Sequence, residues 1–296
     1  MPPRLVSVAI LVYWSIAAFF LLKWEVLPEL SLGYPPDLRS IASAAGGESG
    51  PVSWSIDVID DPQHPEIRRN VGQATTESKR LPTGGYELTS KVAFDAGELL
   101  KRTPLASSQG VRLTIDGDYR VDPRGDLKWF TMKVKGPGAG DDLFRVEGKV
   151  QDGRMDVKAK GIASVLGLQR SFPYQSRSVV YDALRPLDRL PGLQVGQRWD
   201  MQVVNPLSGA VETARVEVMR RTFIDWNGEA VSAFEVEQRA GPIVTMTWVR
   251  VDGAILRQQV PLPFVNMMLE RLPPGDPPRP PAEVERGRSG NGEEGS

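Results

Sequence analysis

The residue types that most often do chemistry in proteins are scarce in this sequence. Cysteine is absent, which removes thiolate nucleophiles, disulfides, Cys-ligated zinc, iron–sulfur clusters and the acylatable cysteine of a lipoprotein. The single histidine, His64, lies between Pro62 and Pro65 and has no second His, Cys or suitable neighbour to complete a zinc site or a Ser-His-Asp triad. We expect an exposed loop imidazole, and we predict no catalytic residue, no metal site and no cofactor.

Two further patterns resemble sites only superficially. The acidic residues at 116, 118, 122 and 126 lack the sixth-position Gly and the twelfth-position Glu of a calcium-binding EF-hand loop. The sequence GPGAG at 136–140 lacks the Lys-Ser/Thr pair and the helix of a phosphate-binding loop. A solvated charged strand and a strand-connecting loop are the favoured interpretations.

Carboxylates leave one enzymatic alternative open. With 37 Asp and Glu residues, a pair of acids for glycoside hydrolysis is conceivable, but no spacing selects one. A carboxylate-dependent hydrolase is therefore kept as a remote alternative. The net charge of −1 and the pI of about 6.0 give no basic field that would attract nucleic acid, so we expect no nucleic-acid partner.

Aromatic residues and methionines in the C-terminal half could line a cavity for an apolar ligand. In the strand predicted at 243–251, Val244, Met246 and Trp248 alternate with Ile243 and Val249, so both faces have apolar side chains. The candidate cavity residues are Trp199, Phe234, Val236, Met246 and Trp248. The alternative is a sheet packed on both sides by its own chain.

The elements that must position these residues are mainly β-strands. Val111, Leu113 and Ile115 alternate with Arg112 and Thr114, which is typical of a half-buried strand. Comparable segments lie at 52–59, 86–94, 127–135, 144–150, 154–160, 198–204, 211–224, 230–239, 243–251 and 254–262. Asp-Gly at 152–153, Asn-Gly at 227–228 and Asp-Gly at 252–253 predict hairpins, and a fourth turn is predicted at 122–125. Successive hairpins predict a large curved antiparallel sheet or an incomplete barrel.

Helices are expected to be few and short. The candidates are 96–102, 181–190 and 264–271, and Pro104 and Pro191 would end the first two. The fold class is therefore mainly β, with one N-terminal transmembrane helix before the sheet.

That transmembrane helix is predicted from residues 5–22, an uncharged apolar run between Arg4 and Lys23. A cleaved signal peptide is the rival interpretation, but no small-residue cleavage site follows closely. Trp24 and Lys23 suit a helix end at the lipid headgroups, and Arg4 favours a cytoplasmic N-terminus. We predict a single-pass signal-anchor in the lipid bilayer, with the rest of the chain extracytoplasmic.

Composition divides the chain into four parts. Residues 1–24 form the anchor, the Pro- and Gly-rich residues 25–50 a flexible tether, and residues 51–272 the β-rich extracytoplasmic domain. The Pro-, Gly- and charge-rich residues 273–296 are predicted to be a disordered tail.

The stretch 178–262 has a further pattern. It reads YDALRPLDRLPGLQVGQRWDMQVVNPLSG, a hairpin at WNGE, and then AFEVEQ and TWVRVDGAILRQQVPL. This layout resembles uncharacterised bacterial envelope proteins with a lipocalin-like half-barrel, and is similar to the outer-membrane lipoprotein carrier class. The resemblance implies a curved antiparallel sheet that wraps a helix and shelters an acyl chain. The predicted anchor departs from a soluble carrier and puts shuttling across the periplasm in doubt.

These observations lead to a first hypothesis of a non-enzymatic, membrane-anchored envelope protein. Its β domain would bind a hydrophobic ligand, such as a lipid or an acyl chain, or a lipidated partner. The alternative is an interaction or scaffold module that recruits another envelope protein.

Overall fold

The computed structural model describes most of the predicted β-rich region and little outside it. The described residues are 14–17, 50–61, 64, 67–100, 111–123, 126–136, 142–161, 169–174, 188–204, 211–241, 243–262 and 265–275. The predicted anchor at 5–22 lies outside them except for 14–17, and so do most of the tether and of the tail. Within these ranges, no helix is both long and apolar enough to span a membrane.

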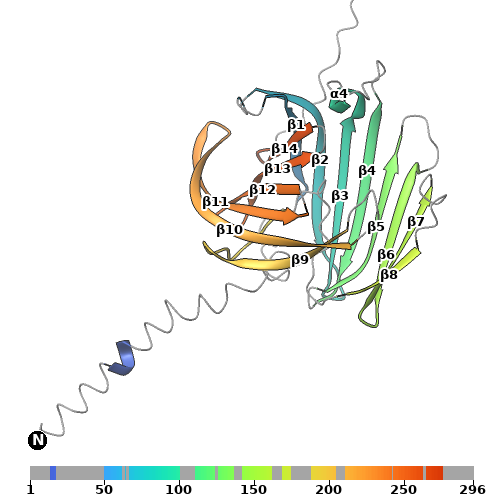
Figure 1. The fold of residues 1–296 in the computed structure, drawn as a ribbon, viewed down its shortest axis with the longest axis horizontal. Coiled ribbons are helices and arrows are strands. Elements are labelled where there is room, and N and C mark those ends of the chain that lie inside the picture. The colour runs from blue at the N-terminus through green and yellow to red at the C-terminus, as the bar shows by residue number, and fades with distance from the viewer. Residues whose placement is uncertain are drawn as a thin grey trace, which may run out of the picture.

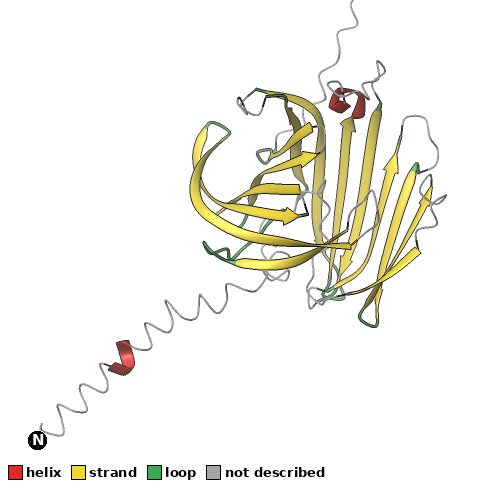
Figure 2. Cartoon of the chain, viewed as in Figure 1, coloured by secondary structure: helices red, strands yellow, loops and turns green. Residues whose placement is uncertain are grey.

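Fourteen strands form one antiparallel sheet in the described part of the chain (Figures 1 and 2). The first eight are β1 (Val52–Ile59), β2 (Arg68–Arg80), β3 (Tyr86–Asp95), β4 (Arg112–Val121), β5 (Leu127–Lys135), β6 (Phe144–Gln151), β7 (Arg154–Gly161) and β8 (Gln169–Pro173). The other six are β9 (Arg198–Val204), β10 (Val211–Trp226), β11 (Glu229–Ala240), β12 (Ile243–Arg250), β13 (Ile255–Leu262) and β14 (Val265–Arg271). The mainly β prediction is confirmed.

The strand order is a meander whose two ends meet in the middle of the sheet. The order is β8-β7-β6-β5-β4-β3-β2-β1-β14-β13-β12-β11-β10-β9, so consecutive strands pair except β8 and β9, and the additional pair is β1 with β14. Strands β8 and β9 lie at the two edges. The sequence predicted the hairpins but not the pairing of β1 with β14, which joins the first strand to the last.

Two tight hairpins form as their turn residues predict. Asp152 and Gly153 have φ angles of 51° and 71°, and Asn227 and Gly228 have 55° and 80°. Two consecutive positive φ values are the mark of a type I′ turn, whose twist matches that of the flanking strands. The β12–β13 turn differs, because only Gly253, with φ of 88°, is left-handed there.

One predicted helix is confirmed in part and another is wrong. A short helix, α4 (Ala96–Leu100), occupies the start of the predicted 96–102 segment. The segment predicted as a helix at 264–271 is instead strand β14. Met267, Met268 and Leu269 are all buried, which removes the alternation that usually marks a strand. Pairing with β1 and β13 overrides the helical preference of Met and Leu. Residues 181–187 of the third predicted helix lie outside the described ranges.

The sheet has two faces of different chemistry. The face that contains Trp54, Tyr119 and Val236, here called the apolar face, forms one hydrophobic cluster of buried residues drawn from both halves of the chain. The opposite face, which contains Ser55, Asp118 and Glu270, is called the polar face. Fully burying one large apolar side chain stabilises the fold by roughly 1.5–3 kcal/mol, so the apolar face supplies the main stabilisation.

The connection from β8 to β9 also packs against the sheet. The carboxylate of Asp188 accepts hydrogen bonds from the hydroxyls of Thr76 and Ser78 on β2, the latter at 3.2 Å. The backbone carbonyl of Asp188 accepts one from the amide of Ile255 at 3.1 Å. Residue 188 therefore ties β2 to the start of β13 across the intervening strands β1 and β14.

Candidate functional site

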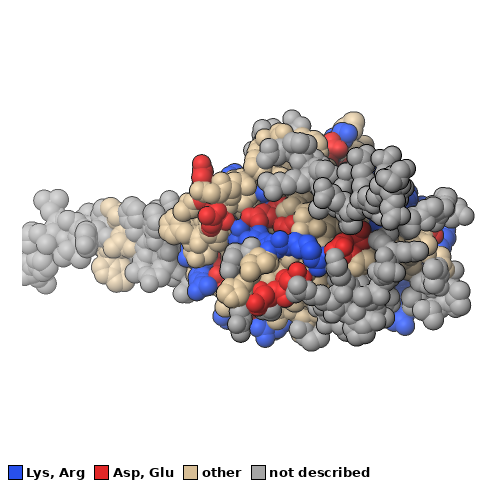
Figure 3. Space-filling model, turned by 90° about the horizontal axis from the view of Figure 1, so that it is seen from above, with Lys and Arg blue, Asp and Glu red and all other residues tan. Residues whose placement is uncertain are grey.

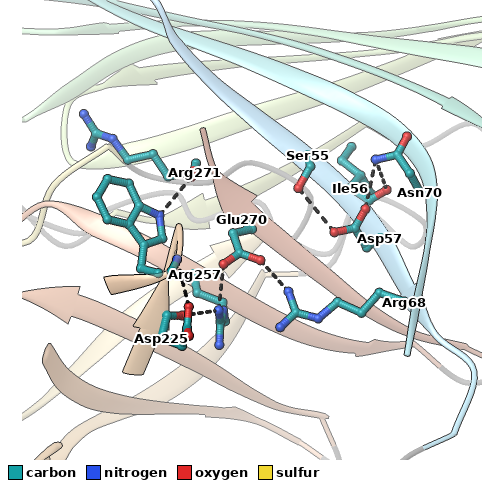
Figure 4. A network of polar contacts seen from close by, with 11 residues as sticks. Ser55, Ile56, Asp57, Arg68, Asn70, Asp225, Arg257, Glu270 and Arg271 are labelled. Carbon is teal, nitrogen blue, oxygen red and sulfur yellow. Dashed lines mark hydrogen bonds and ion pairs between the residues drawn. The ribbon is translucent and has the colours of Figure 1, made fainter. Parts of the chain in front are cut away.

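The polar face carries a sheltered group of charges at the centre of the sheet. Arg68 on β2 and Arg257 on β13 both donate to the carboxylate of Glu270 on β14, the second at 2.6 Å (Figure 4). The three side chains are only 21%, 15% and 19% exposed. Charged groups so far removed from water are retained only when they are paired, and here one carboxylate holds two guanidinium groups.

Asp57 on β1 extends this group. It accepts hydrogen bonds from Asn70 Nδ2 at 2.9 Å and from Ser55 Oγ at 3.3 Å. Burial raises the pKa of the Asp57 carboxyl above its ordinary value, and these hydrogen bonds together with the charge of Arg68 oppose the shift only in part. The charge of Glu270 adds to the increase. The two carboxyl groups therefore influence each other electrostatically.

Curvature of the C-terminal half brings the tip of the β10–β11 hairpin against this region. The tip of the β10–β11 hairpin reaches β13 and β14 although β11 and β12 lie between them in the sheet. Trp226 Nε1 donates to the Arg271 carbonyl at 3.0 Å, and Arg257 Nη2 donates to the Asp225 carbonyl at 2.8 Å (Figure 4). Irregular register at Val218/Arg220 and at Trp248/Val249 accompanies the bend, as expected for β-bulges.

Several polar atoms in this region are buried without a hydrogen-bond partner. They are Asn70 Oδ1, Gln73 Oε1, Arg257 Nε and Asn266 Oδ1. All four residues lie on the polar face. The registers place Gln73 opposite Ser55, Asn70 opposite Asp57 and Arg257 opposite Glu270, and Asn266 is four residues before Glu270 on β14. Buried polar groups normally find partners, so such a concentration is unusual.

Apolar side chains border the charges on the same face. Met268 is 3% exposed, and it pairs with Asp57 on β1 and with Gln259 on β13. Met246 lies beyond Gln259, and Trp248 lies opposite Arg257. A ligand on this part of the face would therefore meet both charged and apolar groups. We call the set Ser55, Asp57, Arg68, Asn70, Gln73, Arg257, Asn266 and Glu270 the central polar cluster.

The five predicted cavity residues are divided between the two faces. Trp199, Phe234 and Val236 belong to the apolar face, where Trp199 and Val236 are 7% and 2% exposed. Met246 and Trp248 lie on the polar face, since the β11–β12 register places them opposite Glu237 and Glu235. The structure therefore brings Met246 and Trp248 to the central polar cluster and places the other three in the core.

The central polar cluster was missed by sequence reasoning. Arg68 and Glu270 are 202 residues apart, and Asp57 and Asn70 lie on two further strands. No short motif contains them. The local signal is Glu270 and Arg271 at the end of β14, in a segment that the sequence predicts as a helix.

The acidic residues near 116–126 take part in surface pairs and in a turn. Asp116 pairs with Lys135 at 2.8 Å, and this hydrogen bond raises the pKa of Lys135. Asp122 pairs with Lys128 at 3.0 Å and accepts the amide of Asp126. Among the described residues, no three His, Asp or Glu side chains are grouped closely enough to hold a metal ion. His64 is exposed, and its backbone amide donates to the Asp61 carbonyl at 3.0 Å.

A second charged group involves Arg69, which the register places opposite Val58, on the face of β2 away from the central polar cluster. Arg69 pairs with Asp60 at 3.3 Å and with Glu98 of α4 at 2.7 Å. Viewed from above, the described surface shows basic side chains in a band between acidic ones (Figure 3). Interleaved charges of both signs give this surface no strong field of one sign.

Comparisons with known proteins identify no family. No family model matches this chain, and no curated protein matches it. Among solved structures, a β-barrel-like protein of a domain of unknown function (DUF1849) from Brucella abortus is similar, with 12% identity and a TM-score of 0.48, over 75% of this chain and 94% of that one. A DUF1089 family protein from Pseudomonas aeruginosa has 14% identity and a TM-score of 0.36, over 62% and 87%. Likenesses this distant transfer no function.

Proposed function

We propose that this chain is a non-enzymatic binding protein of the cell envelope whose curved sheet holds an amphiphile, such as a lipid or an acylated partner. The observation that carries the proposal is the polar face at β12–β14. There, Met246, Trp248 and Met268 adjoin the sheltered charges of Arg257 and Glu270. An apolar chain and a polar head both find matching chemistry on one continuous surface.

The polar contacts of the central polar cluster favour binding over catalysis. Each of the two carboxylate oxygens of Glu270 already accepts from a guanidinium group, so Glu270 is poorly placed to attack a substrate or to take a proton. Asp57 is engaged by Asn70 and Ser55. Pairs of this kind fix the geometry of a binding surface more readily than they supply a free acid and base.

The resemblance to lipocalin-like half-barrels supports the same proposal. A curved antiparallel sheet is what that resemblance implies, and strands β10 and β11 curve in the C-terminal half, where Trp226 reaches β14 (Figure 1). The predicted anchor at 5–22 would hold such a domain within reach of its own membrane. Binding of a lipid presented by that membrane is the role we propose.

Copurification tests the proposal. The full chain is purified in detergent, exchanged extensively, and extracted with organic solvent, and the extract is analysed by mass spectrometry. We expect a stoichiometric amphiphile from the wild type and less than a tenth of it from Trp248→Glu, which replaces an apolar side chain opposite Arg257 with a carboxylate. Phe223→Glu serves as the control because Phe223 is 74% exposed. Equal amounts from all three proteins, or none from the wild type, would overturn the proposal.

The sheet edges favour a second function, recruitment of another envelope protein. In the described part of the chain, β8 pairs on one side only, with β7, and β9 only with β10. An edge strand offers free backbone groups to a partner strand. Crosslinking in membranes with a photoreactive residue at position 169 would recover a partner adduct, and recovery of monomer alone would contradict this function.

A further inference from the structure

The hydrogen-bonding capacity of the central polar cluster indicates what kind of head group it would accept. Asn70 Nδ2 faces three oxygens, Asp57 Oδ1 at 2.9 Å, the Gly72 carbonyl at 3.2 Å and the Ile56 carbonyl at 3.3 Å. This arrangement fixes the orientation of the amide, because the opposite flip would place oxygen against oxygen. The unpartnered atom of Asn70 is therefore an acceptor.

Acceptors dominate the unpartnered atoms of the cluster. Asn70 Oδ1, Gln73 Oε1 and Asn266 Oδ1 accept, whereas Arg257 Nε donates. They come from β2, β14 and β13, which with β1 are four neighbouring strands. Four strands span about 14 Å at a spacing of about 4.8 Å. A matching ligand must therefore present several hydrogen-bond donors over that width, and at least one acceptor.

The charge balance of the cluster excludes most ionic head groups. Arg68 and Arg257 are offset by Glu270 and Asp57, so the formal charges cancel. A phosphate would have to compete with Glu270 for both arginines, and an ammonium group would offer nothing for Arg257 Nε to donate to. A hydroxyl group both donates and accepts, without charge. Several hydroxyls on one scaffold meet all the requirements together.

The aromatic side chains beside the cluster fit the same ligand class. Trp248 lies opposite Arg257 in the register, and the indole of Trp226 is oriented by its hydrogen bond to Arg271. The flat apolar face of an indole suits the C–H-lined face of a sugar ring, while amides and carboxylates suit its hydroxyls.

We propose that the central polar cluster is a binding site for a polyhydroxylated group, a sugar or another polyol, either as the head group of an amphiphile or as a free saccharide. The inference rests on the proposed function and names the polar part of the ligand. Asn70, Gln73 and Asn266 accept from its hydroxyls, and Arg257 donates to one of them.

Two substitutions separate recognition from folding. Gln73→Leu and Asn266→Leu each remove an unpartnered acceptor and leave the ion pairs of Glu270 intact. Replacing a buried, unsatisfied polar group with an apolar one of similar size is expected to be neutral or stabilising, so both variants should fold. Gln169→Leu is the matched control, because Gln169 is exposed on β8, far from the cluster in the strand order.

The binding measurement has two arms. Full-length protein in a sugar-free detergent is titrated with soluble mono-, di- and trisaccharides, and separately with phosphatidylcholine vesicles that contain either a glycolipid or an anionic phospholipid. We expect saturable binding to a saccharide or to glycolipid vesicles, and an affinity at least tenfold lower in Gln73→Leu and in Asn266→Leu. Gln169→Leu should stay within twofold of the wild type. Binding of a soluble saccharide would identify a free sugar as the ligand, and binding of glycolipid vesicles would identify a lipid head group.

Failure of this inference can be told from failure of the proposed function. If an amphiphile copurifies but only anionic vesicles bind, or if both leucine variants bind like the wild type, the polyol site is wrong and amphiphile binding stands. If a saccharide binds with the expected loss in both variants while no amphiphile copurifies, the site stands and the proposed function falls. Absence of all binding overturns the polyol site.

Discussion

The polar face of the sheet carries charges in two settings, and the contrast between them locates the candidate site. On β3–β5 the pairs Arg120–Glu87 and Lys135–Asp116 lie in the open, with their basic side chains 44% and 47% exposed. On β2, β14 and β13 the pairs of Glu270 with Arg68 and Arg257 have side chains that are 15–21% exposed. The same face of one continuous sheet is thus a solvated surface in one half and a sheltered surface in the other.

Local bending of the sheet accounts for this difference. In the C-terminal half, the tip of the β10–β11 hairpin approaches β13 and β14 through Trp226 and Asp225. Removal from water strengthens electrostatic interactions and makes an unpaired charge costly, which is why we place the candidate site in the sheltered region.

The largest effect should come from removing the shared carboxylate. Glu270→Ala leaves the side chains of Arg68 and Arg257 without their acceptor, and we expect a loss of about 2–3 kcal/mol in the free energy of unfolding, measured by urea denaturation. Glu87→Ala is the matched control on the exposed half, with an expected loss below about 0.5 kcal/mol. Equal losses would remove the contrast between the two regions.

The next largest loss of stability should come from breaking the contact between the β10–β11 hairpin and β14. Trp226→Phe keeps an aromatic ring but removes the donor to the Arg271 carbonyl, with an expected cost of about 0.5–1.5 kcal/mol. Phe223→Ser on the same strand should change stability by less than about 0.5 kcal/mol, because Phe223 is 74% exposed. If the two variants are equally stable, the hairpin does not shelter the polar face in the way that the contact suggests.

The pH dependence of stability should reveal Asp57. Because burial raises the pKa of Asp57 in the folded state, the protonated form favours folding below about pH 3.8, and this contribution is lost as the pH rises through the folded-state pKa. Asp57→Asn should therefore gain stability relative to the wild type as the pH increases from 3.5 to 7. Denaturant midpoints at several pH values measure the trend. A difference that is constant with pH would contradict the sheltered setting.

Salt should produce the smallest effect. Double-mutant cycles for Arg257 with Glu270 and for Arg120 with Glu87 are compared at 0.05 M and 0.5 M NaCl. The exposed pair has an expected coupling of about 0.2–1 kcal/mol that falls with salt. The coupling of the sheltered pair should be larger and change less, because mobile ions screen partly buried charges poorly. If the sheltered pair has no larger coupling than the exposed pair, or if its coupling falls as much with salt, the proposed difference in environment is wrong.

Much of the fold could be predicted because most strands have one buried face. The bounds predicted for the strands at 52–59, 127–135 and 198–204 agree with β1, β5 and β9. Period-two alternation was sufficient there. Strand β2 was missed because its sequence, RRNVGQATTESKR, is mostly polar, and few of its side chains identify the face that it buries. Strand β14 was assigned to a helix because burial on both of its faces removes the alternation.

The candidate site could be predicted only in part. Met246 and Trp248 were singled out because apolar residues occupy both faces of β12, and the structure places them beside the central polar cluster. The charged members could not be found, since Arg68 and Glu270 meet through the pairing of β1 with β14. That pairing joins segments from the two ends of the domain, and no local pattern encodes it.

The pairing of β1 with β14 also dictates when the domain can be completed. Strand β1 can pair with β14 only after β14 has been synthesised. During synthesis, β2–β8 can therefore form hairpins while one side of β1 remains an unpaired edge. Contacts between residues about 200 positions apart are slow to form, and an edge that stays open is exposed to wrong partners. Among the fourteen strands, β1 is synthesised first and β14 last. The longest delay before pairing is complete therefore falls on β1, which carries Ser55 and Asp57 of the central polar cluster.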